Sequence, residues 1–195
     1  MRKVQMNSND ESGPGIGLSF TRRMPLSWKC FAATAGGREE RVERMRNERL
    51  LQLLLFFDEY HNDRRDEEGE HKSDLERVEA KLDAVIHLLT FLIKQNEGGA
   101  DESLVTVAAH HLEWTEEKRN TPARRDRVWV LLEIDPRLPQ ALKLAAEVVQ
   151  LTPIGADQVK VRVKLSDQGG WAQEALEKLI FRIHRREIAR IRSGG

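Results

Sequence analysis

Apolar residues between positions 75 and 92 recur at alternating steps of three and four. This repeat of 3.5 residues is typical of a coiled coil, in which heptad positions a and d face a partner helix. With Leu75 at position a, leucine fills every a position and valine fills the first two d positions. Leucine at a with β-branched residues at d favours tetramers. The residues expected at an oligomer interface are Leu75, Val78, Leu82, Val85, Ile86, Leu89, Leu92 and Ile93.

A second apolar helix is predicted before this one, from about Arg38 to His61. The charged stretch 62–72 would connect the two helices as an antiparallel hairpin, and Ser73 with Glu76 forms a capping box at the start of the later helix. Apolar faces this wide cannot cover each other within one hairpin. We therefore expect self-association rather than packing within a single chain.

Alternation of apolar and polar residues predicts strands on both sides of the hairpin. The first runs from Met24 to Phe31, and the next begins at Leu104, with a bulge at His110 and His111 where the buried phase changes. Three more segments complete the pattern of strands, and a helix follows them. These are strands at Arg127–Ile134, Leu142–Val148 and Val159–Leu165, and a helix at Trp171–Arg192 with Leu176, Leu179, Ile180, Ile183, Ile188 and Ile191 facing inward.

Strands joined by short turns leave exposed edges unless the sheet closes or is covered. We therefore expect a small antiparallel barrel or strongly curved sheet, with the last helix over an open end. The hairpin becomes an insertion after the first strand. The expected organisation is a disordered tail at 1–20, a barrel with its C-terminal helix at 21–34 and 104–192, and the inserted hairpin at 35–99.

Composition indicates how large a core the protein can form and in which cellular compartment it lies. The 195 residues are 39% hydrophobic, enough for a real core, and 32 basic side chains balance 32 acidic ones. A single cysteine, Cys30, excludes an internal disulfide, fits a reducing compartment and lies in an apolar run that predicts a buried thiol. No stretch approaches a membrane span of about 18 apolar residues. We expect a cytoplasmic protein without membrane insertion.

Few residues suggest catalysis, metal binding or nucleic-acid binding. Neighbouring histidines on a strand, such as His110 and His111, point to opposite faces and cannot jointly hold one metal ion without a bulge, and no cysteine or carboxylate ligand lies at a suitable spacing. The carboxylate pair Glu116–Glu117 is expected in a polar loop, without the apolar pocket that tunes a general acid. The last helix combines a basic run with acidic residues, which indicates a solvated helix face. The basic residues are Arg182, His184, Arg185, Arg186, Arg190 and Arg192, and the acidic ones are Glu174, Glu177 and Glu187. We expect no enzyme, no metal site and no nucleic-acid partner.

Several segments resemble the PilZ family, and within it the atypical subgroup that forms tetramers. They are MPLSWKCF, KSDLERVEAKLDAVIHLLTFLI, VTVAAHHLEW, WVLLEIDPRLPQALKLAAEVV and EKLIFRIHRREIARIR, and they cover nearly everything after residue 22. The resemblance implies an α+β fold with a six-stranded barrel, a C-terminal helix and a parallel four-helix coiled coil made by the second inserted helix. It also implies a bacterial signalling protein connected with type IV pilus motility, biofilm or virulence.

PilZ domains mostly bind cyclic di-GMP through an Arg-x-x-x-Arg motif before the first strand and an Asp/Asn-x-Ser-x-x-Gly motif on the second. Here Arg22 and Arg23 stand in the neighbourhood of the first motif, but the residues four positions later are not arginines. Aligning the second motif puts Thr106 at Asp/Asn, Ala108 at serine and His111 at glycine. Because the motif is degenerate, we expect no cofactor and no binding of cyclic di-GMP by the usual mode.

Three functions follow from these observations. The first is a homotetrameric scaffold that acts through a protein partner. The second is a divergent cyclic di-GMP receptor that uses Arg22 and Arg23 with residues of a neighbouring subunit. The third is a nucleic-acid binder that uses the basic last helix.

Overall fold

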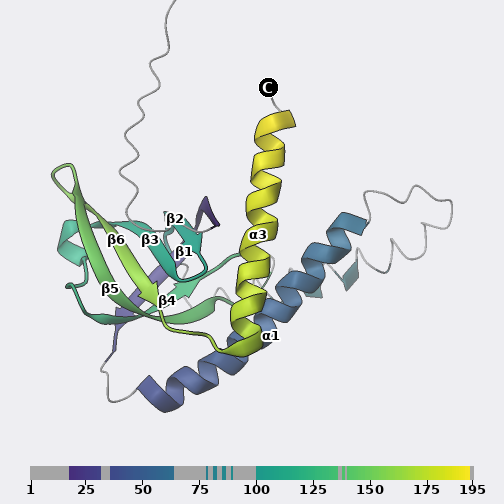
Figure 1. The fold of residues 1–195 in the computed structure, drawn as a ribbon, viewed down its shortest axis with the longest axis horizontal. Helices are drawn as coiled ribbons and strands as arrows, with labels where there is room; N and C mark the ends of the chain where they lie inside the picture. The colour runs from purple at the N-terminus through teal and green to yellow at the C-terminus, as the bar shows by residue number, and fades with distance from the viewer. Residues whose placement is uncertain are drawn as a thin grey trace, which may run out of the picture.

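A computed structural model of the chain describes residues 18–31, 36–63, 100–135 and 140–193, together with Val78, Lys81, Leu82, Val85, Ile86, Leu89 and Leu138. Six antiparallel strands close into a barrel in the order β1-β2-β3-β6-β5-β4, which confirms the expected α+β barrel fold (Figure 1). The strands are β1 (Ser19–Cys30), β2 (Glu102–Ala108), β3 (His111–Glu117), β4 (Arg127–Leu132), β5 (Leu142–Ile154) and β6 (Gln158–Leu165), with a 3-10 turn, η1 (Lys118–Asn120), after β3.

The long strand β1 closes the barrel. Its first half pairs with β2 as far as Pro25, and its second half, from Leu26, pairs with β4. At the change of partner the carbonyl of Pro25 accepts the N–H of Glu133 at 3.1 Å, so the backbone stays hydrogen-bonded. The strand starts at Ser19 and buries Phe20, so these two residues belong to the barrel rather than to the expected tail.

The expected bulge at His110 and His111 is wrong. β2 ends at Ala108 and β3 begins at His111, so the two halves of the predicted strand form a hairpin. Val107 on β2 pairs with Leu112 on β3, and both face the core. The change of apolar phase is the same for a bulge as for a tight turn, because either one reverses which residues point inward.

Two side chains expected inside the protein are exposed. Cys30 is the last residue of β1, at the rim of the barrel, where its thiol lies 3.6 Å from the Asp126 carboxylate. Partial burial and the nearby Asp126 charge raise the pKa of this thiol. Ile188 is exposed because the C-terminal half of its helix extends beyond the barrel (Figure 1). The side chain of Ile191 lies outside the described residues.

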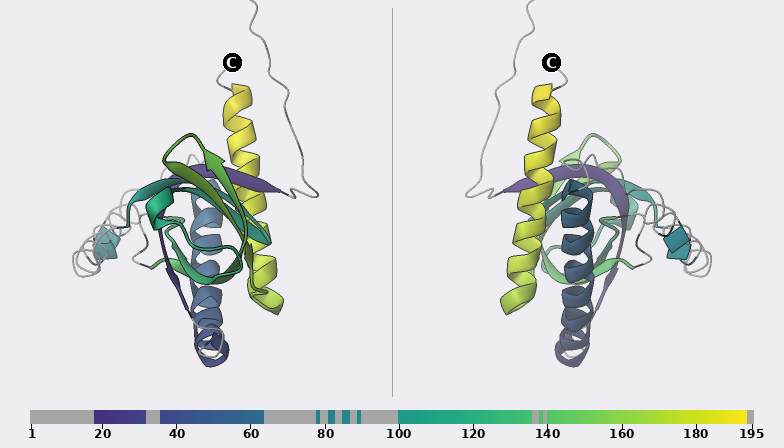
Figure 2. Two further views of the ribbon diagram at one scale, coloured as in Figure 1. Left: turned by 90° about the vertical axis from the view of Figure 1, so that its left-hand side faces the viewer. Right: turned by 90° about the vertical axis from the view of Figure 1, so that its right-hand side faces the viewer.

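Helices α1 (Gly36–Asp63) and α3 (Gly170–Ser193) lie side by side across one side of the barrel (Figure 2). Left-handed backbone at Gly169 (φ 79°) turns the chain into α3, a conformation that glycine adopts at little cost. No described helix combines the length and apolar character of a membrane span. The helices bury Leu50, Leu51, Leu54 and Leu55 of α1 and Leu176, Leu179, Ile180 and Ile183 of α3 in one core with the inward side chains of the barrel.

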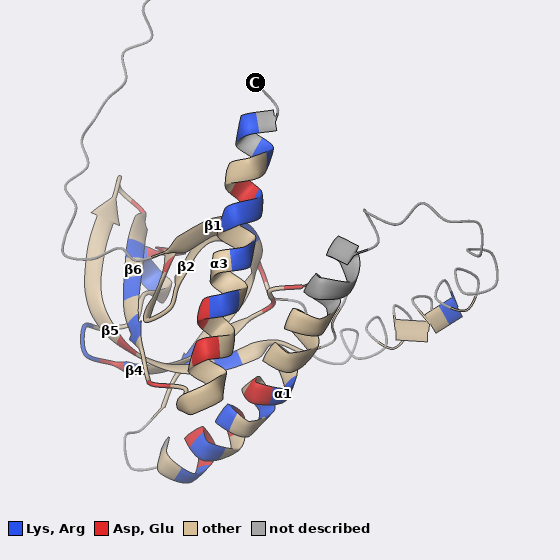
Figure 3. Ribbon diagram, turned by 45° about the vertical axis from the view of Figure 1, so that its right-hand side comes forward, with Lys and Arg blue, Asp and Glu red and all other residues tan. Residues whose placement is uncertain are grey.

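The first half of α1, rich in charges of both signs (Figure 3), is fastened to β5 at Lys143. β6 pairs with β5 only from Ala146 onward, so the edge of β5 at Lys143 lacks a strand partner on that side. The Asn47 side chain fills this place: its amide donates to the Lys143 carbonyl at 2.9 Å, and its oxygen accepts the Lys143 N–H at 3.1 Å. The Lys143 ammonium also contacts Glu39 at 2.8 Å and Glu43 at 3.1 Å. We name these contacts the α1 clasp.

Substituting Asn47→Ala should weaken the α1 clasp. Both hydrogen bonds to the Lys143 backbone are lost, which should lower the free energy of unfolding by about 1–3 kcal/mol in urea denaturation. Gln52, exposed on the same helix, offers a matched control, and Gln52→Ala should change stability by less than about 0.5 kcal/mol. Equal effects of the two substitutions would contradict this role for Asn47.

Candidate functional site

The residues at the degenerate nucleotide motifs come from β1, β2 and β3, which are neighbours in the barrel. In the register of these strands Thr21 is opposite Thr106, and their hydroxyl oxygens are 2.8 Å apart. Thr106 in turn faces Glu113 on β3. The structure therefore places Thr106 on an outer face of the barrel whose polar groups bond to one another.

The two arginines of the first motif point in opposite directions. Neighbouring residues of a strand lie on opposite faces, and Arg22 shares its face with the buried Phe20 and Met24. Its guanidinium lies 3.5 Å from Glu187 of α3, whereas Arg23 shares the outer face with Thr21. The structure therefore does not bring Arg22 and Arg23 together on one face of β1.

The other two motif positions differ in exposure. Ala108, where the family has a serine, is only 2% exposed. His111, where the family has a glycine, is half-buried at the start of β3. Partial burial lowers the pKa of His111 because it disfavours the charged imidazolium, Arg162 adds repulsion, and Glu113 partly offsets both. The site therefore contains a histidine that prefers to be neutral.

An ion-pair cluster that the sequence analysis did not anticipate lies beside these residues. The Glu113 carboxylate on β3 pairs with Arg162 on β6, its cross-strand neighbour, and lies 3.8 Å from the Lys160 ammonium. Alternating polar residues on both strands were the available signal. Only the register between β3 and β6 shows that Glu113 and Arg162 meet.

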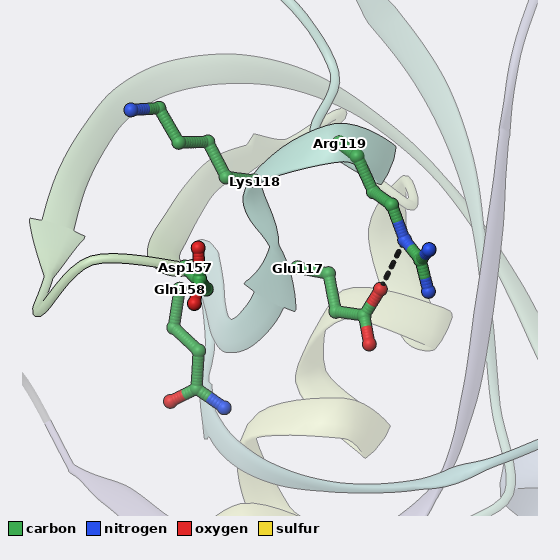
Figure 4. A pocket seen from close by; sticks show the side chains of 5 residues that line it. All are labelled: Glu117, Lys118, Arg119, Asp157 and Gln158. Carbon is green, nitrogen blue, oxygen red and sulfur yellow. Dashed lines mark hydrogen bonds and ion pairs between the residues drawn. The ribbon is translucent and has the colours of Figure 1, made fainter.

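Glu116 and Glu117 end β3 rather than lying in a loop. The Glu116 carboxylate accepts the indole N–H of Trp28 at 2.7 Å and that of Trp114 at 3.4 Å, so it links a side chain of β1 to one of β3. Glu117 instead pairs with Arg119 at 2.6 Å in the wall of a surface pocket of about 590 Å³ (Figure 4). This pocket, which Lys118, Asp157 and Gln158 complete, contains none of the residues at the nucleotide motifs.

The heptad residues are the other candidate site. Those that the structure describes are helical, and Val78, Leu82, Val85 and Leu89 each expose between 52% and 56% of their surface. Ile86 is half-buried, and Leu75, Leu92 and Ile93 lie outside the described residues. Among the described residues no group of three or more histidine, cysteine, aspartate or glutamate side chains could hold a metal ion.

Comparison with known proteins identifies the family. A family model described as "Atypical PilZ domain, cyclic di-GMP receptor" matches residues 50–193. The chain belongs to the atypical PilZ domain family. This membership confirms the resemblance seen in the sequence and places the barrel among receptor domains of cyclic di-GMP signalling.

One solved structure supports the PilZ assignment over nearly the whole chain. It is a pathogenic protein from Xanthomonas campestris, described as a tetrameric PilZ domain that self-assembles through an unusual helical bundle. The two chains are 26% identical, the match covers 88% of this chain and 90% of the other, and the TM-score is 0.66. A search of curated proteins found no significant match.

The lowered pKa of His111 predicts a pH effect on the stability of this PilZ domain. A histidine with a folded-state pKa below its unfolded value of 6.5 contributes stability that is complete above pH 6.5 and is lost as the pH falls through the folded pKa. Unfolding measured in urea at pH 7.5 and at about pH 5.5 should therefore show a larger acid loss in the native protein than in His111→Gln. An identical acid loss in both proteins would contradict this assignment.

Proposed function

We propose that this PilZ protein is a non-enzymatic signalling scaffold that assembles as a homotetramer through its heptad helix and acts through a protein partner. The observation that carries the proposal is the exposure of four successive seam residues, Val78, Leu82, Val85 and Leu89, at just over half of their surface. A row of exposed apolar side chains at heptad spacing favours a partner helix.

The assembly of the Xanthomonas campestris protein supports the same copy number here, because that protein is described as a tetramer built by a helical bundle. The seam sequence favours tetramers independently, through leucine at a and valine at d. Full burial of each leucine contributes roughly 1.5–3 kcal/mol. Because each seam position would occur four times in a tetramer, the summed gain is large compared with the entropy lost on association.

For cyclic di-GMP we propose that the usual binding mode is lost. Three observations support this proposal: Arg22 and Arg23 face opposite ways, Ala108 is buried, and His111 replaces the glycine that lets the backbone approach the ligand. Loss of one guanidinium contact to phosphate costs about 1.5–3 kcal/mol. The described polar groups beside Thr106 are also already bonded to each other.

A second candidate is a divergent receptor of cyclic di-GMP. The description of the family as a cyclic di-GMP receptor favours it. In this case Arg23 on the outer face would act together with residues of a neighbouring subunit. The assembly would then be needed to complete the ligand site, which makes the two candidates separable by experiment.

Leu89→Asp should break the proposed tetramer. An aspartate at an a position places a charge in each of four facing sites, which an apolar seam cannot solvate. Sedimentation equilibrium should show a species with four times the chain mass of 22.4 kDa for the native protein and a smaller species for the variant. The matched control is Leu104→Asp on β2, which is 53% exposed and should keep the native mass. A tetrameric Leu89→Asp protein would show that the seam is assigned wrongly.

Leu112→Ala tests whether the stability of the barrel and the copy number of the assembly are independent. Leu112 is fully buried in the barrel, and its truncation should cost about 2–5 kcal/mol of stability without changing copy number at a temperature where the variant stays folded. Thermal unfolding followed by circular dichroism and the sedimentation mass measure the two quantities. A change of copy number in this variant would contradict the independence of the two parts.

Titration calorimetry with cyclic di-GMP decides between the two candidates. The scaffold proposal predicts no binding heat at micromolar protein, for the native tetramer and for Arg23→Ala alike. Micromolar or tighter affinity that Arg23→Ala and Leu89→Asp both abolish would instead establish the divergent receptor.

A further inference from the structure

The two sides of β1 carry different sets of backbone groups. In an antiparallel pair, alternate residues point their N–H and C=O groups to opposite sides of the strand. The carbonyl of Pro25 and the N–H of Phe31 bond to β4 at 3.1 and 3.0 Å, so residues at odd positions face β4. The N–H of Leu26 bonds instead to the carbonyl of Asp101, before β2, at 3.2 Å. Backbone groups at even positions therefore point away from β4.

Among the described strands, none lies on that side of β1 beyond Leu26. β2 pairs with β1 only over Ser19–Pro25, and the contact at Asp101 ends its row. In the described part of the chain, no backbone group bonds to the N–H or C=O of Trp28 or of Cys30 on this side. Cys30 is also exposed to solvent. We name the backbone groups of Trp28 and Cys30 the open edge of β1.

The open edge lies where a longer β2 would continue between β1 and β3. Trp28 is opposite the buried Val130, so its side chain is on the inner face of the barrel, and its indole reaches across to Glu116 of β3 at 2.7 Å. The backbone of Glu117 on β3 is already engaged, because its N–H bonds to the Glu116 side chain and its carbonyl accepts the Thr121 hydroxyl. The unpaired backbone groups are therefore those of β1.

An extended peptide is the occupant that fits such an edge. Alternating N–H and C=O groups are matched by another extended backbone, whereas a helix already uses its backbone groups internally. A strand of a second barrel does not fit, because an incoming strand would lie between β1 and β3 with both of its own edges free. Each strand of this closed barrel already pairs with two neighbours.

We propose that the open edge of β1 binds an extended segment of the protein partner, which adds one strand beside β1. The residue opposite Trp28 points inward, where the contact between Trp28 and Glu116 fills the space. The segment therefore carries glycine, alanine or serine at that residue, and the residues next to it point outward to solvent. This inference deepens the proposed scaffold function and rests on it, since it describes how the partner is held.

Selection of binders to the native full-length protein from a phage library of random heptapeptides tests the inference. Synthetic copies of the selected peptides should bind at least about tenfold more weakly to Cys30→Pro, because proline removes an N–H of the open edge and places its ring there. The N–H of Cys30 faces away from β4, so the substitution removes no bond between β1 and β4. The matched control is Cys30→Ser, which also removes the thiol, keeps the N–H and should bind as the native protein does.

Hydrogen exchange followed by NMR gives a second measurement, made on the native protein. The amides of Trp28 and Cys30 should exchange rapidly without peptide and at least about tenfold more slowly with it. The amides of Ser27 and Lys29, which pair with β4, should be slow in both samples. N-methylation of every second residue of the peptide should abolish binding in one of its two alternating phases, a result that does not depend on the folding of any variant.

Three results overturn the inference: no selected binder, binders that Cys30→Pro and N-methylation leave unaffected, or slow exchange of Trp28 and Cys30 in the protein alone. The last result would show that another segment of this chain or a second copy fills the open edge. Sedimentation mass of the same samples separates this inference from the proposed function. A tetramer that fails these tests contradicts the peptide contact alone, whereas peptide binding by a protein that is not a tetramer contradicts the assembly alone.

Discussion

Closure of the barrel by β1 is the constraint on which the rest of the structure depends. β1 pairs with β2 up to Pro25 and with β4 from Leu26, which removes both edges of the sheet. The insertion between β1 and β2 therefore leaves from the rim of a closed barrel. The α1 clasp attaches the first helix of this insertion to the barrel, because Asn47 hydrogen-bonds the otherwise open edge of β5 at Lys143. Barrel and helical layer thus share one core, and the heptad helix follows α1 in the chain.

The nucleotide-motif surface of the barrel and the heptad seam differ in whether their side chains already have partners within the chain. On the barrel, Thr106 bonds to Thr21, and Glu113 pairs with Arg162, so a ligand there would compete with existing contacts. The described seam residues instead keep about half of their apolar surface in water. Burial of apolar surface is the main driving force of association. This difference supports the proposal that this PilZ protein acts through assembly rather than through nucleotide binding.

The periodicity of apolar residues predicted the elements for which the sequence pattern fits only one kind of secondary structure. The alternation along β6 and the helical spacing of Leu176, Leu179 and Ile183 each match the structure. The pattern gave a wrong prediction at the β2–β3 hairpin, because a bulge and a tight turn produce the same change of apolar phase. It also predicted burial wrongly for Cys30 and Ile188, where a strand or helix extends past the core.

Contacts between distant elements could not be predicted. The Glu113–Arg162 pair, the α1 clasp and the contact between Arg22 and Glu187 depend on strand register and helix docking, and no local pattern encodes either.

Disulfide trapping at the seam tests the assembly most directly. In a Cys30→Ser background, Leu82→Cys at position a should form disulfide-linked dimers under mild oxidation, because a parallel bundle places identical a positions face to face. His87→Cys at the outward position f should not. Absence of a Leu82→Cys crosslink, or equal crosslinking at both positions, would contradict the account.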